Sequence, residues 1–169
     1  MSGPTIRIRS AEPADYLALQ RIHEQPKVIR GTLQLPFPSA ESWRKRMADP
    51  QEGHRALLAC VEQEVVGVIS ITQPPVPRRR HVGQIGMSVH DDWQGKGVGK
   101  ALMQAAVDLA DRWLNLTRLE LSVFTDNTVA IALYEKFAFK VEGTHEQYAF
   151  NDGRLADVYA MARIRRHDS

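Results

Sequence analysis

The spacing of hydrophobic residues changes along the chain between two periods, and each period predicts one type of secondary structure. Short runs that are apolar, or that alternate apolar and polar residues, predict strands. The predicted strands cover residues 6–9, 56–61, 65–72, 82–89 and 119–123, and two more flank the turn at 151–153. Apolar residues that recur every three or four positions predict helices. The predicted helices cover residues 13–23, a short stretch that begins after Ser39, residues 98–113 and residues 127–137.

The order of these elements is β-α-α-β-β-β-α-β-α-β-β. Residues 62–64 form a connection short enough to join antiparallel neighbours as a hairpin, whereas helices separate the strands in the second half. This mixture predicts an α/β fold in which one mixed sheet carries helices on its faces. The proline-rich stretch 74–80 is typical of a stiff loop rather than of a domain linker. We therefore predict a single domain over residues 1–169.

Composition and charge narrow the classes of function. Of the 169 residues, 43% are hydrophobic and 25% are charged, which is enough for a sizeable core without disulfides. A net charge of +2 is too small to suggest a face built for nucleic acid. Residues 1–10 alternate Ile and Arg where a signal peptide would be apolar, and no run approaches the roughly 18 apolar residues of a membrane span. With Cys60 as the single cysteine, expected in the core, these features predict a cytoplasmic protein without nucleic-acid or membrane partners.

The most informative segment is the loop between the strand at 82–89 and the helix that follows it. This loop carries Gly95, Gly97 and Gly99. Glycines at a helix start let the backbone approach a ligand, and the unpaired helix N–H groups there favour an anion such as a pyrophosphate. Lys96 and Lys100 either add charge for that anion or are solvated lysines at a helix end. A tight turn without a ligand is the alternative, although one glycine would suffice for it. The spacing excludes the G-x-x-x-x-G-K-[ST] and G-x-G-x-x-G motifs.

Two motifs carry a resemblance to a known family. Residues 94–99, Gln-Gly-Lys-Gly-Val-Gly, match Q-x-x-G-x-G and resemble the loop of the GNAT superfamily of acetyl-CoA-dependent N-acetyltransferases. Downstream, Asn127 precedes the run 130–139, Ala-Ile-Ala-Leu-Tyr-Glu-Lys-Phe-Ala-Phe, which is similar to the family's Asn-initiated helix and the aromatic-Gly-Phe corner at its end. The resemblance implies the GNAT fold, with a central, mostly antiparallel sheet of six to seven strands and about four flanking helices. It also implies acetyl-CoA as cosubstrate.

Residues 22–26, 32–36 and 142–144 look like a bacterial branch of this family that acetylates L-amino acids. This likeness implies direct acetyl transfer to a small primary amine, the α-amino group of an amino acid. Other acceptors stay open, namely an aminoglycoside, a polyamine or a protein N-terminus, and so does a CoA-binding sensor without turnover. A basic patch with Arg30 or Arg78–Arg80 would favour an acceptor with a carboxylate, and an acidic cleft would favour a cationic one. The implied acceptor-binding residues are Thr32, Leu33, Gln34 and Phe37.

The resemblance also assigns roles in catalysis. Tyr134 would donate a proton to the leaving thiolate, which suits a phenol with a pKa of about 10 beside a thiol with a pKa of about 8.5. The backbone N–H of Val89 would bind the thioester oxygen. Each assignment has a plain alternative, because Tyr134 could simply pack in its helix and Asn127 could be an N-cap rather than a ligand of pantetheine. The implied cofactor-binding residues are Met87, Val89, Gln94, Gly95, Lys96, Gly97, Val98, Gly99, Lys100, Asn127 and Tyr134.

The general base has no single candidate. Some GNAT relatives carry a glutamate near the positions of Gly83 and Gln84, and neither of these residues accepts a proton at pH 7. His81, His90 and Glu120 are alternatives, and deprotonation through ordered water is another.

Four further features complete the expectations. Ala138 stands where the family usually has glycine, which puts the backbone angle of that corner in question. Arg78–Arg80 either contact a carboxylate or the 3′-phosphate of CoA, or form a solvated loop. A homodimer is a hypothesis, since dimers are common in the family and the last two strands offer an edge. No metal is predicted, because no metal-binding spacing occurs among His23, His54, His81, His90, His145 and His167.

Overall fold

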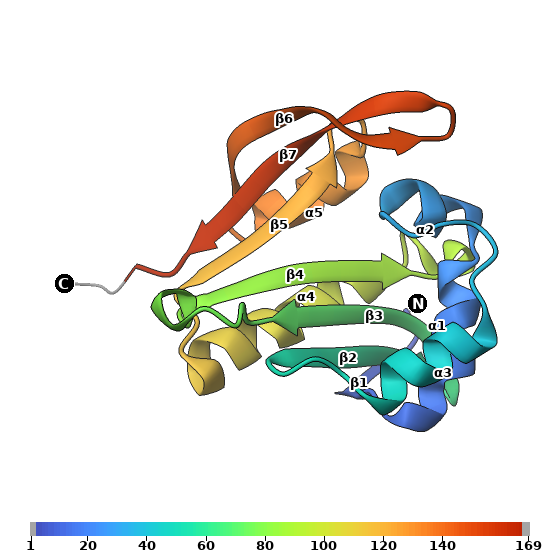
Figure 1. Cartoon of the computed structure of the whole chain (residues 1–169). Coiled ribbons are helices and arrows are strands. Elements are labelled where there is room, and N and C mark those ends of the chain that lie inside the picture. The colour runs from blue at the N-terminus through green and yellow to red at the C-terminus, as the bar shows by residue number, and fades with distance from the viewer. Residues whose placement is uncertain (1–2, 167–169) are drawn as a thin grey trace.

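The computed structural model describes residues 3–166, and its seven strands form one sheet (Figure 1). Across the sheet their order is β1-β2-β3-β4-β5-β7-β6. The strands are β1 (Ile6–Ser10), β2 (His54–Val61), β3 (Glu64–Thr72), β4 (Val82–Val89), β5 (Arg118–Phe124), β6 (Lys140–Asn151) and β7 (Arg154–Ile164). The helices are α1 (Tyr16–His23), α2 (Pro26–Gly31), α3 (Ala40–Ala48), α4 (Val98–Leu109) and α5 (Thr128–Lys136). His167, and both ends of the predicted domain at residues 1–2 and 167–169, lie outside the described residues.

The sheet opens in its middle, between β4 and β5. Every other neighbouring pair is antiparallel, whereas β4 and β5 are parallel. They pair only from Val82 with Arg118 to Gln84 with Glu120, and their remaining lengths pair only with their outer neighbours, β3 and β7. The two strands diverge beyond this point (Figure 1). The prediction of a mixed, mostly antiparallel sheet of six to seven strands is confirmed.

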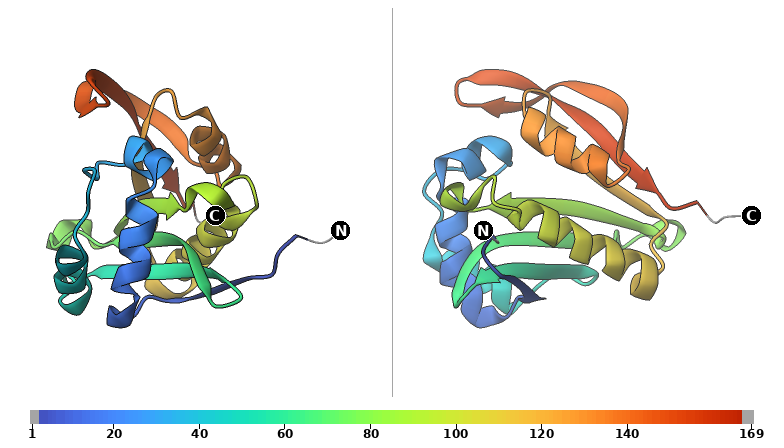
Figure 2. Two further views of the ribbon diagram at one scale, coloured as in Figure 1. Left: turned by 90° about the vertical axis from the view of Figure 1, so that its right-hand side faces the viewer. Right: turned by 180° about the vertical axis from the view of Figure 1, so that it is seen from behind.

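Each face of the sheet has its own hydrophobic core. On one face lie α4 and α5, seen in front of the strands in the view from behind (Figure 2). There Leu102 and Met103 of α4 are fully buried against Ile69 of β3. On the opposite face, Ile22 of α1 and Trp43 of α3 pack in a second core that includes Leu58, Val68 and, as expected, Cys60.

Residues 3–166 contain five α-helices, close to the predicted four, but the structure corrects their order, because three of them precede β2 where two are predicted. The additional helix is α2, which has six residues, begins at Pro26 and buries only Val28. So short a helix shows too little of the 3.6-residue period to be recognised in a sequence. The predicted first helix is also divided, since residues 13–15 form a 3₁₀ turn before α1.

Trp113 is a second correction, because its spacing predicts a place on the buried side of the long helix. The side chain is 78% exposed. The α-helix ends at Leu109, and residues 110–114 continue it as a π-helical turn. A π turn takes more than 3.6 residues, so the turn shifts the residues after it relative to the apolar side of α4.

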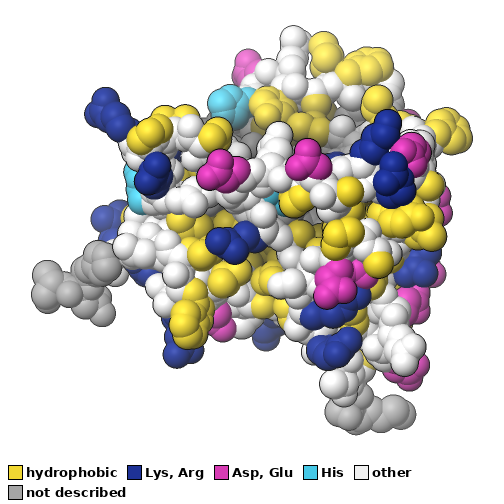
Figure 3. Space-filling model, turned by 60° about the horizontal axis from the view of Figure 1, so that its bottom comes forward, with side chains coloured by type: hydrophobic (Ala, Val, Ile, Leu, Met, Phe, Trp, Pro, Cys, Tyr) yellow, Lys and Arg dark blue, Asp and Glu magenta, His cyan; other side chains and the backbone are white. Residues whose placement is uncertain are grey.

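The outer surface carries charges of both signs. On the face in Figure 3, Lys and Arg side chains are interspersed with Asp and Glu side chains. No helix among residues 3–166 has the length and apolar character needed to cross a membrane.

Candidate active site

A cavity of about 2000 Å³ lies where β4 and β5 diverge. Its walls come from the two strands, the end of α2, the loop before α4, the helix α5 and the β6–β7 hairpin. Met87 and Val89 of β4 and Leu121 and Val123 of β5 line the opening. Segments far apart in the chain, from α2 to the β6–β7 hairpin, therefore meet at the break in the sheet.

The backbone of β4 turns two N–H groups toward this gap. The N–H of His90, directly after β4, donates to the carbonyl of Val66 in β3, at 2.9 Å. Because consecutive residues of a strand direct their N–H groups to opposite edges, the N–H groups of Val89 and Met87 face β5 instead. Pairing with β5 ends at Gln84. The two donors therefore face the cavity rather than a neighbouring strand.

The glycine loop lies against one end of the gap and leads into α4. Gly95 and Gly97 have φ angles of +73° and +86°, which are left-handed conformations that favour glycine. A Cβ atom at either position would meet nothing within 4 Å, so the backbone is bare toward the cavity. The side chain of Gln94 donates from Nε2 to the carbonyl of Val89, at 3.1 Å, and ties the loop to β4.

Gly99 serves a different purpose from the other two glycines. It lies in the first turn of α4, and a Cβ atom there would be 3.1 Å from Cδ2 of Leu133 and 3.4 Å from Cε of Met87. The glycine thus lets α4 approach α5 and β4 closely. Gly95 and Gly97 thus both adopt turn conformations and Gly99 allows close packing, which corrects the expectation that one glycine would suffice for the turn.

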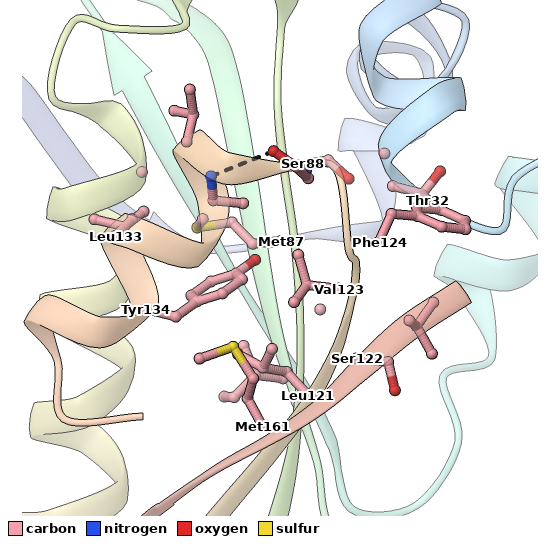
Figure 4. Close-up of a pocket in the computed structure, with 18 of the residues that line it drawn as sticks. Thr32, Met87, Ser88, Leu121, Ser122, Val123, Phe124, Leu133, Tyr134 and Met161 are labelled. Carbon is pink, nitrogen blue, oxygen red and sulfur yellow. Dashed lines mark hydrogen bonds between the residues drawn. The ribbon is translucent and has the colours of Figure 1, made fainter. Parts of the chain in front are cut away.

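The Tyr134 hydroxyl points into the gap between Met87 and Val123 (Figure 4). Its ring packs on Phe139, with ring centroids 5.9 Å apart, and the residue is only 8% exposed. Burial disfavours the charged phenolate and raises the pKa of Tyr134 to about 12. The phenol therefore stays protonated throughout the neutral range.

Asn127 caps α5 and also lines the cavity. Its Oδ1 accepts from the backbone N–H of Ala130, at 3.3 Å, which confirms the N-cap. A Cβ atom on Gly31 would lie 3.7 Å from its Nδ2, so the end of α2 is next to this amide.

Comparisons with known proteins identify relatives of this chain. The model of the acetyltransferase (GNAT) family matches residues 18–139. The chain is also 44% identical over 160 residues to the L-amino acid N-acetyltransferase AaaT of Escherichia coli (strain K12), covering 95% of this chain and 98% of that protein. The chain belongs to the GNAT family of acetyltransferases. The resemblance given by the two sequence motifs is thereby confirmed.

Solved GNAT structures share the fold. An acetyltransferase of the GNAT family from Streptococcus pneumoniae superposes with a TM-score of 0.80 and 26% identity, covering 95% of this chain and 99% of that one. Spermidine N-acetyltransferase from Vibrio cholerae, solved in complex with CoA and spermine, superposes with a TM-score of 0.81 and 22% identity, covering 94% and 95%. At that identity the second likeness shows the fold alone.

Most residues that the GNAT motifs suggested line the cavity, but four do not. Lys96 lies over the ring of Trp93, with Nζ 5.0 Å from the ring centroid, and Val98 is buried in the core. Gln34 is outside the lining, and Phe37, 96% exposed, borders a separate small hollow with Glu24 and Pro36. The predicted residues that do line the cavity are Met87, Val89, Gln94, Gly95, Gly97, Gly99, Lys100, Asn127, Tyr134, Thr32 and Leu33.

Two of the residues considered for ligand binding, Arg79 and Thr32, have partners within the protein. Arg79 forms an ion pair with Glu120 at 2.6 Å, and Arg78–Arg80 do not line the cavity, which favours a solvated loop over a ligand contact. Thr32 faces Phe124 in the cavity (Figure 4). Its hydroxyl donates to the carbonyl of Val28 at 2.8 Å, which closes the end of α2.

The candidate bases are not equivalent. His81 and His90 lie outside the cavity lining, and Nδ1 of His90 accepts from the backbone N–H of Asp92 at 3.1 Å. Glu120 lines the cavity but is bound by both Arg118 and Arg79. Burial opposes ionisation of Glu120, yet these hydrogen bonds outweigh it and hold its pKa below the usual value. Among residues 3–166, no group of three or more His, Cys, Asp or Glu side chains is arranged to hold a metal ion.

Sequence reasoning missed the side of the cavity formed by the β6–β7 hairpin. In the sequence, this hairpin shows only a strand pattern and a turn signal. Of its lining residues, only Glu142 belongs to a segment, 142–144, that resembles the family. Their contact with the site depends on tertiary structure, since the side chain of Asn151 reaches the carbonyl of Arg30, 121 positions earlier in the chain. The missed lining residues on this hairpin are His145, Tyr148, Asn151, Asp152, Arg154, Val158, Ala160 and Met161.

Proposed function

We propose that this GNAT protein transfers the acetyl group of acetyl-CoA directly to the α-amino group of an L-amino acid. The observation that carries the proposal is the gap between β4 and β5, into which two backbone donors and one buried phenol point. Direct transfer needs a polarised thioester carbonyl and a proton for the departing thiolate, and these groups supply both.

The loop before α4 suits the pyrophosphate of acetyl-CoA. The bare backbone of Gly95 and Gly97 leaves room for phosphate oxygens, and the first N–H groups of α4 favour an anion. Lys100 lines the same cavity and would add positive charge. Acetyl-CoA supplies the reactive thioester. We assign the amide of Asn127 to its pantetheine arm, because Asn127 lines the same cavity as the loop and Tyr134.

The chemistry follows from the two strands and α5. We assign the N–H of Val89, with Met87 beside it, to the thioester oxygen, where negative charge develops during attack. Tyr134 is assigned to the thiolate that leaves, because its raised pKa keeps a proton available. Arg118 and Arg79 already hold Glu120, so we propose that the attacking amine loses its proton to water in the cavity.

Charge in the cavity favours an amino acid over a polyamine. The lining contains six basic residues and four acidic ones, and two of the acids, Glu120 and Glu142, are paired with Arg118. A polycation would meet a net positive wall, whereas a carboxylate would find free positive charge. The 44% identical relative is named for acetylation of L-amino acids, which agrees with this balance. The basic lining residues are Lys27, Arg30, Lys100, Arg118, Lys136 and Arg154.

The test is release of CoA from acetyl-CoA, measured with a thiol reagent, in the presence of each of the twenty amino acids, spermidine or an aminoglycoside. We expect release with a subset of the amino acids. Release with only spermidine or only the aminoglycoside would show that the acceptor is a polyamine or an aminoglycoside rather than an amino acid. If no amine releases CoA while acetyl-CoA still raises Tm, the protein is a CoA-binding sensor or acts on a protein acceptor.

Three further properties remain proposals. We propose a single domain in the cytoplasm, where the thiol of Cys60 stays reduced. We also propose a homodimer, because β6 is an edge strand with largely exposed residues and such edges pair readily. Light scattering that finds only a monomer would exclude the dimer.

A further inference from the structure

At one end of the cavity, where we place the acceptor, a hydrogen bond joins the β6–β7 turn to α2. The side chain of Asn151 donates from Nδ2 to the backbone carbonyl of Arg30, at 2.9 Å. Asp152 and Gly153 complete the turn with φ angles of +49° and +83°. Arg30, Asn151 and Asp152 all line the cavity. The backbone of the last turn of α2 is therefore fixed beside the site independently of what the Arg30 side chain does.

The guanidinium of Arg30 is held only loosely. Its closest approach to Asp152, from Nε to Oδ2, is 3.7 Å, which is too long for a hydrogen bond. The two side chains are 67% and 76% exposed, and exposed pairs of this kind contribute little to stability. A ligand carboxylate could therefore replace the carboxylate of Asp152 at low cost, with two hydrogen bonds in place of one long contact.

Three of the other five basic lysine and arginine residues around the cavity are less suited to this task. Arg118 is occupied by Glu120 and Glu142, at 2.8 and 2.5 Å. Lys100 and Lys136 belong to α4 and α5, on the face where we place acetyl-CoA. Arg30, in contrast, precedes Gly31, which lies against Asn127 at the gap.

We propose that Arg30 binds the carboxylate of the acceptor amino acid and that Asp152 is the counterion it exchanges for this carboxylate. This assignment rests on the proposed function and adds the residue that selects amino acids over other amines. A planar guanidinium binds a carboxylate with two parallel hydrogen bonds. The acceptor would then be anchored at its carboxylate while its amine extends toward Val89 and Tyr134.

The experiment compares one acetylated amino acid with its carboxamide in the wild type, Arg30→Met, Asp152→Asn and Arg154→Met. For Arg30→Met we expect KM for the amino acid to rise about 10-fold to 100-fold, as for loss of a hydrogen bond to a charged group, with kcat nearly unchanged. For the carboxamide we expect a change of less than about threefold. The acid-to-amide ratio is compared between variants, because the two α-amino groups have different pKa values.

Two controls separate binding from structure. Asp152→Asn breaks the same ion pair, so it reproduces the defect of Arg30→Met only if the pair merely holds the hairpin. Arg154→Met removes an equal charge from another lining residue at the same turn. The Tm shift caused by acetyl-CoA shows whether each variant keeps its fold and cosubstrate site.

The outcomes are distinct. Equal defects in Arg30→Met and Asp152→Asn, equal effects on acid and carboxamide, or selectivity lost in Arg154→Met instead would each overturn the role of Arg30 while the proposed function stands. If the wild type acetylates neither the amino acid nor its carboxamide, the proposed function fails, and this assignment fails with it.

Discussion

The corner after α5 holds a residue in an unfavourable conformation, and we predict that replacing Ala138 with glycine stabilises the protein. Ala138 has a φ of +68°. Its N–H donates to the carbonyl of Glu135 at 3.0 Å, and the N–H of Phe139 donates to that of Tyr134 at 3.1 Å. These two bonds form a Schellman motif, which requires a left-handed conformation at the position of Ala138. An apolar contact usually accompanies the motif, and here Phe139 packs on Tyr134.

The magnitude follows from two opposing effects. A left-handed conformation costs a residue with a Cβ atom about 1 to 2 kcal/mol. Glycine loses more backbone entropy on folding, which costs about 0.5 to 1 kcal/mol. The expected net gain for Ala138→Gly is therefore about 0.5 to 1 kcal/mol, or roughly 1 to 4 °C in Tm for a protein of this size.

Urea unfolding and thermal melts of the wild type and Ala138→Gly measure this difference. Ala132→Gly is the matched control, because Ala132 lies inside α5 and the same change should destabilise by about 1 kcal/mol. We expect kcat of Ala138→Gly to stay near that of the wild type, since both hydrogen bonds around Tyr134 remain. A stability equal to or below that of the wild type would refute the argument from strain.

Two further predictions concern Tyr134 and His23. Tyr134→Phe should lower kcat tenfold or more while the Tm shift with acetyl-CoA stays the same, and an unchanged kcat would remove this residue from the mechanism. His23 is buried, and its ring stacks on that of Trp43 with the ring centroids 4.5 Å apart. Its Nδ1 donates to the carbonyl of Leu19. Burial lowers its pKa from the ordinary 6.5, so the unfolded chain binds the proton first. Stability should be complete above about pH 6.5 and fall as pH decreases below it, and His23→Gln should flatten this dependence in urea titrations. Equal pH slopes in the two proteins would contradict this role.

Sequence patterns predicted the strands well because each one is set by local alternation and burial. The strand predicted at 82–89 is exact, and the other predicted strand ends are within two residues where bounds were given. The departure of Ala138 from the family pattern also pointed to a real feature, since its φ is positive. The errors lie where a short segment or a change of period obscures the pattern, as for α2 and for Trp113.

The two halves of the site differ in how far a sequence can specify them. The half assigned to the cosubstrate is built largely from two continuous stretches, the loop at 94–100 and the segment 127–134, so the spacing of a few residues was enough to suggest it. The acceptor half joins α2, β5 and the β6–β7 turn, and the bond between Asn151 and Arg30 spans 121 positions. No local spacing records such a contact. Use of acetyl-CoA can therefore be inferred from motifs, whereas the choice of acceptor depends on side chains that only the fold brings together.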